Sequence, residues 1–276
     1  MIRAGDADRA EIVAFLQAHL STAMFPLSNL DSFGMAGGHH RAMTFWVDRQ
    51  GGALRDVAGV TDGGMIFPNC PHQPWAALRQ ALLGKNIIGI LGAADQVTGL
   101  ESALGLADAA GLRTVEPHYA LALCDVVMPD VTGFSLRPLS AGPRDLVIGW
   151  RRAYLLETLP LPGEDVDATA IKDIDSYIAA DSHRLLYKGD TPMAMTGFNA
   201  RQPDAVQVGG VYTPPLLRGR GLARRAVALH LEQARKAQAF LFAASDAASR
   251  TYQSIGFQRI GQFGVSLYSQ PQVIHG

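Results

Sequence analysis

The residues best suited to chemistry lie in the stretch VYTPPLLRGRGLARRAVALHL, residues 211–231. Arginine and glycine alternate at 218–221, and a run of helix-forming residues follows at once. A turn that leads into a helix presents unpaired backbone N–H groups and the positive end of the helix dipole, a combination that binds phosphate. Glycine lets a ligand approach the backbone closely, and arginine adds charge-assisted hydrogen bonds. The stretch therefore predicts an anion site, although an ordinary surface turn before a helix has the same composition.

Two common nucleotide motifs are excluded at this loop. The chain has no G-x-x-x-x-G-K-[ST] pattern, so the loop is not a P-loop. It is not a G-x-G-x-x-G loop either, because Arg224 stands where the third glycine would be.

The loop resembles the cofactor loop of the GNAT superfamily of N-acyltransferases, R/Q-x-x-G-x-G/A. Arg218, Gly221 and Ala223 fill its defining positions. The later stretch SDAASRTYQSIGF, residues 245–257, resembles the second signature of that family, N-x-x-A-x-x-x-Y followed by G-F. Two positions depart from the pattern: Ser245 replaces an asparagine, and Thr213 stands where valine is common.

The resemblance extends from about residue 134 to residue 270 and implies a function. It implies an acyl-CoA-dependent N-acyltransferase that moves an acetyl or other short acyl group from acetyl-CoA to a primary amine by direct attack. The loop would hold the pyrophosphate of coenzyme A, and the end of the preceding strand would contact the pantetheine arm and the thioester. The residues assigned to the cofactor in this way are Val211, Tyr212, Thr213, Arg218, Gly219, Arg220, Gly221, Leu222, Ala223 and Ser245.

By the same resemblance, Tyr252 lies near the sulfur of the cofactor and is the expected catalytic residue. A phenol, with a pKa of about 10, can give a proton to a departing thiolate, whose thiol has a pKa of about 8.5. The alternative is a packing tyrosine on a short helix. A non-catalytic acyl-CoA-binding or regulatory protein of the same fold is the competing functional hypothesis.

The base that deprotonates the amine is left open by the sequence. The strand AVQVGGVYT, residues 205–213, carries no acid, and its Gln207 is not a base. His183 or a chain of water molecules could serve. The acidic residues between Glu157 and Asp181 fit either a rim for a cationic amine, small molecule or peptide, or a solvated helix face.

Two internal matches predict a duplicated domain. Residues 2–13 align with 136–147, and each of these segments reads as a short strand, a turn and a helix. Residues 106–123 align with 251–268, and each of these segments reads as a helix, a glycine cap and a strand. We expect two tandem GNAT-like α/β (α+β) domains at 1–128 and 133–276. Each would be a mixed, mostly antiparallel sheet flanked by helices, and Gly209-Gly210 would mark a bulge in the second.

The first copy lacks both chemical signatures. Its loop region, MIFPNCPHQPW at 65–75, has prolines where donors are needed, and Ala107 aligns with Tyr252. We expect this degenerate copy to bind no cofactor and either to complete the acceptor pocket or to pack beside its twin. The second copy alone is expected to bind coenzyme A.

Composition sets wider bounds. The chain has 276 residues, 48% of them hydrophobic, a net charge of −1 and two cysteines. These values favour a cytoplasmic protein with no nucleic-acid or membrane partner. The His39-His40 pair has no third ligand at suitable spacing, so no metal is expected. A homodimer is compatible with the sequence.

Overall fold

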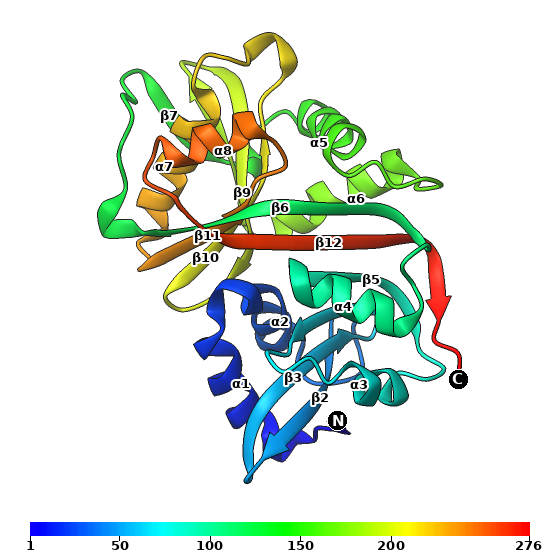
Figure 1. Cartoon of the computed structure of the whole chain (residues 1–276). Helices are drawn as coiled ribbons and strands as arrows, with labels where there is room; N and C mark the ends of the chain where they lie inside the picture. The colour runs from blue at the N-terminus through cyan, green and yellow to red at the C-terminus, as the bar shows by residue number, and fades with distance from the viewer. The chain divides into compact units, whose positions relative to one another are not determined.

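The computed structural model describes residues 1–276, which form two compact units (Figure 1). Unit 1 comprises Met1–Glu116 and Gly261–Gly276, and unit 2 comprises Pro117–Ile260. In each unit helices cover a sheet that is antiparallel except for one parallel pair of strands. The expected mixed, mostly antiparallel sheets are confirmed. No helix combines the length and apolar character needed to cross a bilayer.

Unit 1 orders its strands β1-β2-β3-β4-β5-β12. The strands are β1 (Ile2–Arg3), β2 (Met43–Gln50), β3 (Ala53–Thr61), β4 (Met65–Asn69), β5 (Asn86–Ala93) and β12 (Gln258–Val273), and the helices are α1 (Arg9–Ala18), α2 (Leu20–Phe33), α3 (Trp75–Ala81) and α4 (Ala94–Leu104). β4 and β5 are the parallel pair.

Unit 2 orders its strands β6-β11-β10-β9-β8-β7. The strands are β6 (Ala110–Ala122), β7 (Phe134–Pro138), β8 (His183–Lys188), β9 (Thr191–Arg201), β10 (Ala205–Tyr212) and β11 (Gln238–Phe242), and the helices are α5 (Arg144–Thr158), α6 (Val166–Ala179), α7 (Leu222–Ala234) and α8 (Asp246–Gln253). β10 and β11 are the parallel pair.

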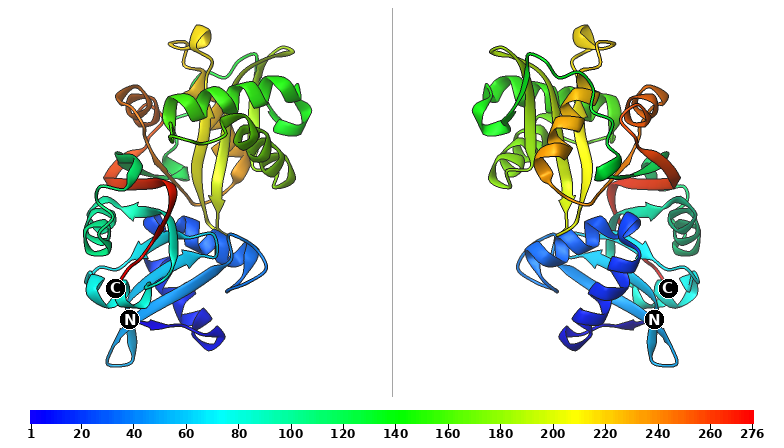
Figure 2. Two further views of the ribbon diagram at one scale, coloured as in Figure 1. Left: turned by 90° about the vertical axis from the view of Figure 1, so that its right-hand side faces the viewer. Right: turned by 90° about the vertical axis from the view of Figure 1, so that its left-hand side faces the viewer.

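Helices cover both faces of the sheet in unit 2. Val147 and Trp150 of α5 and Ile174 of α6 pack against Leu185 and Met195 on one face. On the other face α7 and α8 pack against alternate residues of the same strands. Figure 2 shows α5 and α6 in front of the yellow strands in one view and α7 in front of them in the other. Strand residues therefore alternate between an α5/α6 face and an α7 face.

The two sequence copies exchange their final strands. Residues 118–122 of β6, which lie before the predicted domain boundary at 128–133, pair with β11 in unit 2. Residues 263–273 of β12, at the C-terminal end of the chain, pair with β5 in unit 1. The limits 1–128 and 133–276 stay a prediction about the duplication, while the compact units cross them.

The helix before each final strand ends in the same motif. Gly105 after α4 and Gly256 after α8 have φ of +73° and +105°, values that favour glycine. The residue after each glycine donates its N–H to a helix carbonyl oxygen, that of Glu101 in α4 (2.9 Å) and that of Tyr252 in α8 (3.2 Å). Glu101 is thus the structural equivalent of Tyr252.

This equivalence corrects the alignment made from the sequence. The alignment placed Gly111 on Gly256 and Ala107 on Tyr252, but Gly111 lies inside β6 and caps no helix. The turn between α4 and β6 is longer than its counterpart after α8, and sequence matching without gaps followed the wrong glycine. The first copy still has no tyrosine at this position.

Candidate active site

The sheet of unit 2 opens where β10 leaves β11. The two strands pair only at residues 205–207 of β10 and 238–240 of β11. Beyond that point β11 stays paired with β6, and β10 stays paired with β9. The expected bulge is confirmed, because the β9–β10 register shifts between Gly209 and Tyr212, and Gly210 has φ of +62°. The bulged end of β10 therefore has a free edge.

A loop with unusual backbone angles follows this free edge. After a short 3-10 turn at Pro215–Leu217, Gly219 and Gly221 have φ of +77° and +67°. Gly221 is the N-cap of α7, and the buried Leu222 begins that helix. No backbone N–H group from Gly219 to Ala223 donates a hydrogen bond within the protein. The loop and helix start present five unused donors and the positive end of a helix dipole.

Arg225 organises this loop, and sequence reasoning missed it. Its Nη1 donates to the carbonyl oxygens of Arg220 (2.8 Å) and Gly221 (3.3 Å), and its Nε donates to that of Asp130 (2.6 Å). The carbonyl oxygens of Arg220 and Gly221 thus accept hydrogen bonds from the Arg225 side chain. The backbone N–H groups of the loop remain available to a ligand. The only signal in the sequence was an arginine four residues after Gly221.

The two arginines of the loop are bound to the protein itself. Arg218 pairs with Glu157 of α5 (2.6 Å) and donates to the carbonyl oxygen of Thr213 (2.9 Å). Arg220 donates to the carbonyl oxygen of Leu216 (3.3 Å). Phosphate contacts by these two guanidinium groups stay a prediction.

The end of β10 lies between two hydrophobic clusters. Val211 packs against the cluster under α7 and α8, and Tyr212 packs against the one under α5, 6.2 Å from the ring of Trp150. Burial raises the pKa of the Tyr212 phenol, so it stays neutral. The hydroxyl of Thr213 is buried without a hydrogen-bond partner.

Helix α8 carries the second signature. Ser245 is its N-cap, and the Oγ atom accepts a hydrogen bond from the N–H of Ala248 (3.2 Å). Tyr252 is buried, with its ring edge-on to Phe257 at 6.1 Å. Ser249 lies one turn before Tyr252 on the same helix face, and its buried hydroxyl has no partner. Contact of Ser245 and Tyr252 with a cofactor stays a prediction.

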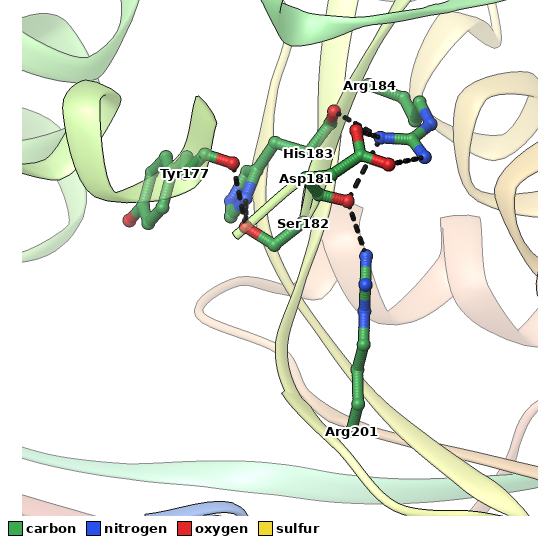
Figure 3. A network of polar contacts seen from close by, with 6 residues as sticks. All are labelled: Tyr177, Asp181, Ser182, His183, Arg184 and Arg201. Atoms are coloured by element: carbon green, nitrogen blue, oxygen red, sulfur yellow. Dashed lines mark hydrogen bonds and ion pairs between the residues drawn. The ribbon is translucent and has the colours of Figure 1, made fainter. Parts of the chain in front are cut away.

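His183 lies against the bulge of β10. Its ring is buried, stacks on Tyr177 at 3.6 Å, and has Nδ1 2.8 Å from the hydroxyl of Ser182 (Figure 3). A Cβ atom at Gly197 or Gly210 would lie within 2.4 Å of the ring, so the imidazole fills the space that these glycines leave. Burial and the charge of nearby Arg151 hold the pKa of His183 well below its usual value. The neutral ring has a buried Nε2 atom without a partner.

Five of the seven carboxylates in the acidic segment between Glu157 and Asp181 pair with arginines. Asp173 pairs with Arg151 (2.6 Å) and Asp167 with Arg152 (2.5 Å). Other pairs in the segment are Asp175 with Arg144, Asp181 with Arg184 and Glu157 with Arg218. These carboxylates do not form a rim of uncompensated negative charge.

The corresponding loop of unit 1 is closed from within. The N–H of Cys70 donates to the side chain of Gln96 (2.7 Å), and the N–H of His72 donates to the buried carboxylate of Asp56 (2.8 Å). The helix that follows, α3, has seven residues and starts after Pro74. Donors that are unused in unit 2 are therefore occupied or replaced by proline in unit 1.

The chain was compared with protein families, curated sequences and solved structures. Residues 150–257 match the model of the Acetyltransferase (GNAT) family. No curated protein sequence matches the chain significantly. Among solved structures, a tandem GNAT protein from the clavulanic acid biosynthesis pathway has 14% identity and a TM-score of 0.56, over 97% of this chain and 96% of that one.

Two further structures are similar along the whole chain. A Drosophila protein has 14% identity and a TM-score of 0.60, over 97% of this chain and 98% of that one. A GCN5-related glucosamine N-acetyltransferase region of a fungal multi-domain GH3 β-N-acetylglucosaminidase has 11% identity and a TM-score of 0.53, over 96% of this chain and 38% of that one. Residues 150–257 thus match the model of the acetyltransferase (GNAT) family, and the fold of the chain is that of the tandem GNAT proteins.

Proposed function

We propose that unit 2 binds acetyl-CoA, or another short acyl-CoA, and transfers the acyl group to a primary amine. The observation that carries this proposal is the row of unused backbone donors from Gly219 to Ala223 beside the free edge of β10. Such a row suits the pyrophosphate of coenzyme A, and the opening between β10 and β11 suits the extended pantetheine arm.

The reaction would form a C–N bond and break the C–S bond of the thioester. Backbone N–H groups at the bulged end of β10 would donate to the carbonyl oxygen as negative charge develops on it. Tyr252 would give its phenolic proton to the departing thiolate. The nitrogen of the amine would lose one proton during the attack, and the phenolate would regain one from solvent.

His183 and a chain of water molecules are the two proposed routes for the proton of the amine, and the lowered pKa of the buried ring weakens His183 as a base. Ser182 lies 3.4 Å from the carbonyl oxygen of Tyr177 and donates to it, so its Oγ accepts from Nδ1–H of the imidazole. This tautomer leaves a lone pair on Nε2, the buried atom beside Gly210. Water molecules remain the alternative route for the proton.

The acceptor is proposed to be a small molecule or peptide with a primary amine. Because arginines pair with five of the seven carboxylates in the acidic segment, recognition of a polycation is not favoured. The glucosamine N-acetyltransferase region among the similar structures makes an amino sugar one of the amines to test. We place the reaction in the cytoplasm, since the two cysteines, Cys70 and Cys124, are both free.

Binding of acetyl-CoA to the full chain and to its Gly221→Val variant tests whether the loop at 218–223 is the cofactor site. Valine strains the left-handed turn and brings a side chain against Arg224 and Arg225, so affinity should fall at least about tenfold. Gly163→Val is the matched control, because Gly163 has φ of +80° in a loop without close neighbours. Equal affinity of both variants for acetyl-CoA would show that the loop does not bind the cofactor.

Thiol release from acetyl-CoA over a panel of amines tests the activity. The panel should include an amino sugar, a polyamine and lysine-containing peptides. Binding of acetyl-CoA without turnover of any amine would favour the non-catalytic acyl-CoA-binding protein over the enzyme.

A further inference from the structure

A second pocket of unit 2 lies on the α7 face, away from the cofactor loop. Its volume is about 270 Å³, and Arg184, Phe198, Arg201, His230 and Lys236 are among the residues that line it. His230 follows Leu222 by eight residues along α7, which is roughly 12 Å at 1.5 Å per residue. The cofactor loop and this pocket are therefore at different ends of the same helix.

Positive charge in this pocket exceeds negative charge. Arg184 forms an ion pair with Asp181 (2.7 Å), whereas the guanidinium of Arg201 donates to the backbone oxygen of Asp181 (2.7 Å) and has no carboxylate partner (Figure 3). Lys236 donates to the backbone oxygen of Pro203 (2.6 Å). Burial, followed by the charge of Arg184, lowers the pKa of Arg201. Three cations thus share one carboxylate, a cluster that an anion would stabilise.

A buried histidine is among the residues that line the same pocket. His230 is 3% exposed, its ring stacks on Phe198 at 3.7 Å, and its Nδ1 atom is buried without a partner. Burial and the charges of Arg184 and Arg201 lower the pKa of His230 to about 3, so the ring is neutral at physiological pH. An unpaired buried nitrogen of this kind costs free energy in the folded protein.

We propose that this pocket binds a compact oxyanion, a phosphate or carboxylate group of a small metabolite, at a site distinct from the coenzyme A loop. The guanidinium groups of Arg184 and Arg201 and the ammonium of Lys236 donate to its oxygens. His230 makes one further hydrogen bond, and Phe198 forms the apolar wall behind it.

The direct test titrates inorganic phosphate, and in parallel acetate, into the full chain at constant ionic strength with coenzyme A present in excess. Excess coenzyme A fills the loop, so any remaining binding belongs elsewhere. Arg201→Met keeps the length of the side chain and removes the charge, and it should weaken binding of the preferred anion about tenfold or more. Arg235→Met is the matched control at the same end of α7, outside this pocket, and should bind like the wild type.

A second readout needs no variant. The imidazole signals of His230 in the NMR spectrum of the wild type should shift on addition of the anion, while those of the exposed His72 should not. Unchanged His230 signals, or equal anion affinity of Arg201→Met and the wild type, would overturn the proposal. Loss of binding on addition of coenzyme A would assign the anion to the cofactor loop instead. None of these readouts depends on turnover, so failure of the proposed enzyme activity would be seen separately.

Discussion

Arg225 and Arg218 show how differently neighbouring arginines act around one loop. Arg225 binds the carbonyl oxygens of Arg220 and Gly221, whereas Arg218 ties the end of β10 to Glu157 of α5. Both guanidinium groups already have partners within the protein. The loop is organised by arginine side chains so that its own backbone does the binding.

At the residue scale, Tyr252→Phe should lower turnover about 10²-fold and leave affinity for acetyl-CoA within about twofold. The phenolic proton is used only as charge develops on the sulfur, whereas the packing of the ring against Phe257 is kept. Single-turnover kinetics and calorimetry measure the two effects. Tyr187→Phe, in the core under α5, is the control and should change neither. Unchanged turnover with Tyr252→Phe would make the tyrosine a packing residue.

At the element scale, Glu101 fastens β12 to unit 1. Its buried carboxylate accepts hydrogen bonds from Ser266 and from Tyr268 (3.5 Å) in β12 and from Arg113 (3.1 Å). Burial raises the pKa of Tyr268 to about 12, which keeps its hydroxyl protonated as a donor. Tyr252, the candidate acid of unit 2, thus corresponds to Glu101 in unit 1, which binds β12 through hydrogen bonds.

Glu101→Ala should therefore destabilise unit 1 by roughly 2–3 kcal/mol, because two buried hydroxyls lose their acceptor. Urea unfolding measures the loss, and hydrogen exchange at residues 263–268 should show β12 opening first. Glu101→Gln keeps an acceptor of the same size and should recover about half of the loss. Equal effects of Ala and Gln would mean that the charge, rather than the hydrogen bonds, holds the strand.

Sequence patterns predicted local features of the fold better than long-range ones. The loop glycines and the bulge at Gly209-Gly210 depend on neighbouring residues, and each left a recognisable pattern. The role of Arg225 and the exchange of β6 and β12 depend on partners far away in the chain, and composition does not encode them. The glycine at 105 was overlooked because Gly111 gave an ungapped match.

At the scale of the whole molecule, stability should fall as pH is lowered from 7.5 to 5. Burial lowers the pKa of His118 to about 4 and that of His230 to about 3, and it lowers that of His183 as well. In the unfolded chain these histidines have a pKa of about 6.5, so below that pH the unfolded state binds protons that the folded state does not. Protonation therefore favours unfolding below about pH 6.5. The loss at pH 5 should be about 2 kcal/mol each for His118 and His230.

Chemical denaturation at several pH values measures this dependence. His230→Gln should remove the share that belongs to His230, about 2 kcal/mol at pH 5. Stability that does not vary between pH 7.5 and 5 would show that these rings are protonated in the folded protein.

Strand exchange decides which fragment can be isolated. A fragment of residues 133–276 lacks β6, the antiparallel partner of β11, and leaves β12 without β5. We expect it to aggregate, and we expect residues 117–260, which match unit 2, to fold and to bind acetyl-CoA. Circular dichroism, gel filtration and calorimetry compare the two. A soluble, acetyl-CoA-binding 133–276 fragment would show that the exchanged strand is dispensable.

The same exchange sets an order of events during synthesis. The segment that forms β5 leaves the ribosome long before the segment that pairs with its outer edge, residues 263–273 of β12. At an elongation rate of about 5–20 residues per second, the delay is roughly ten to thirty seconds. Throughout that interval the nascent chain carries a strand edge that its own sequence has not yet covered, and this edge is where a chaperone, or a second nascent chain, would engage it.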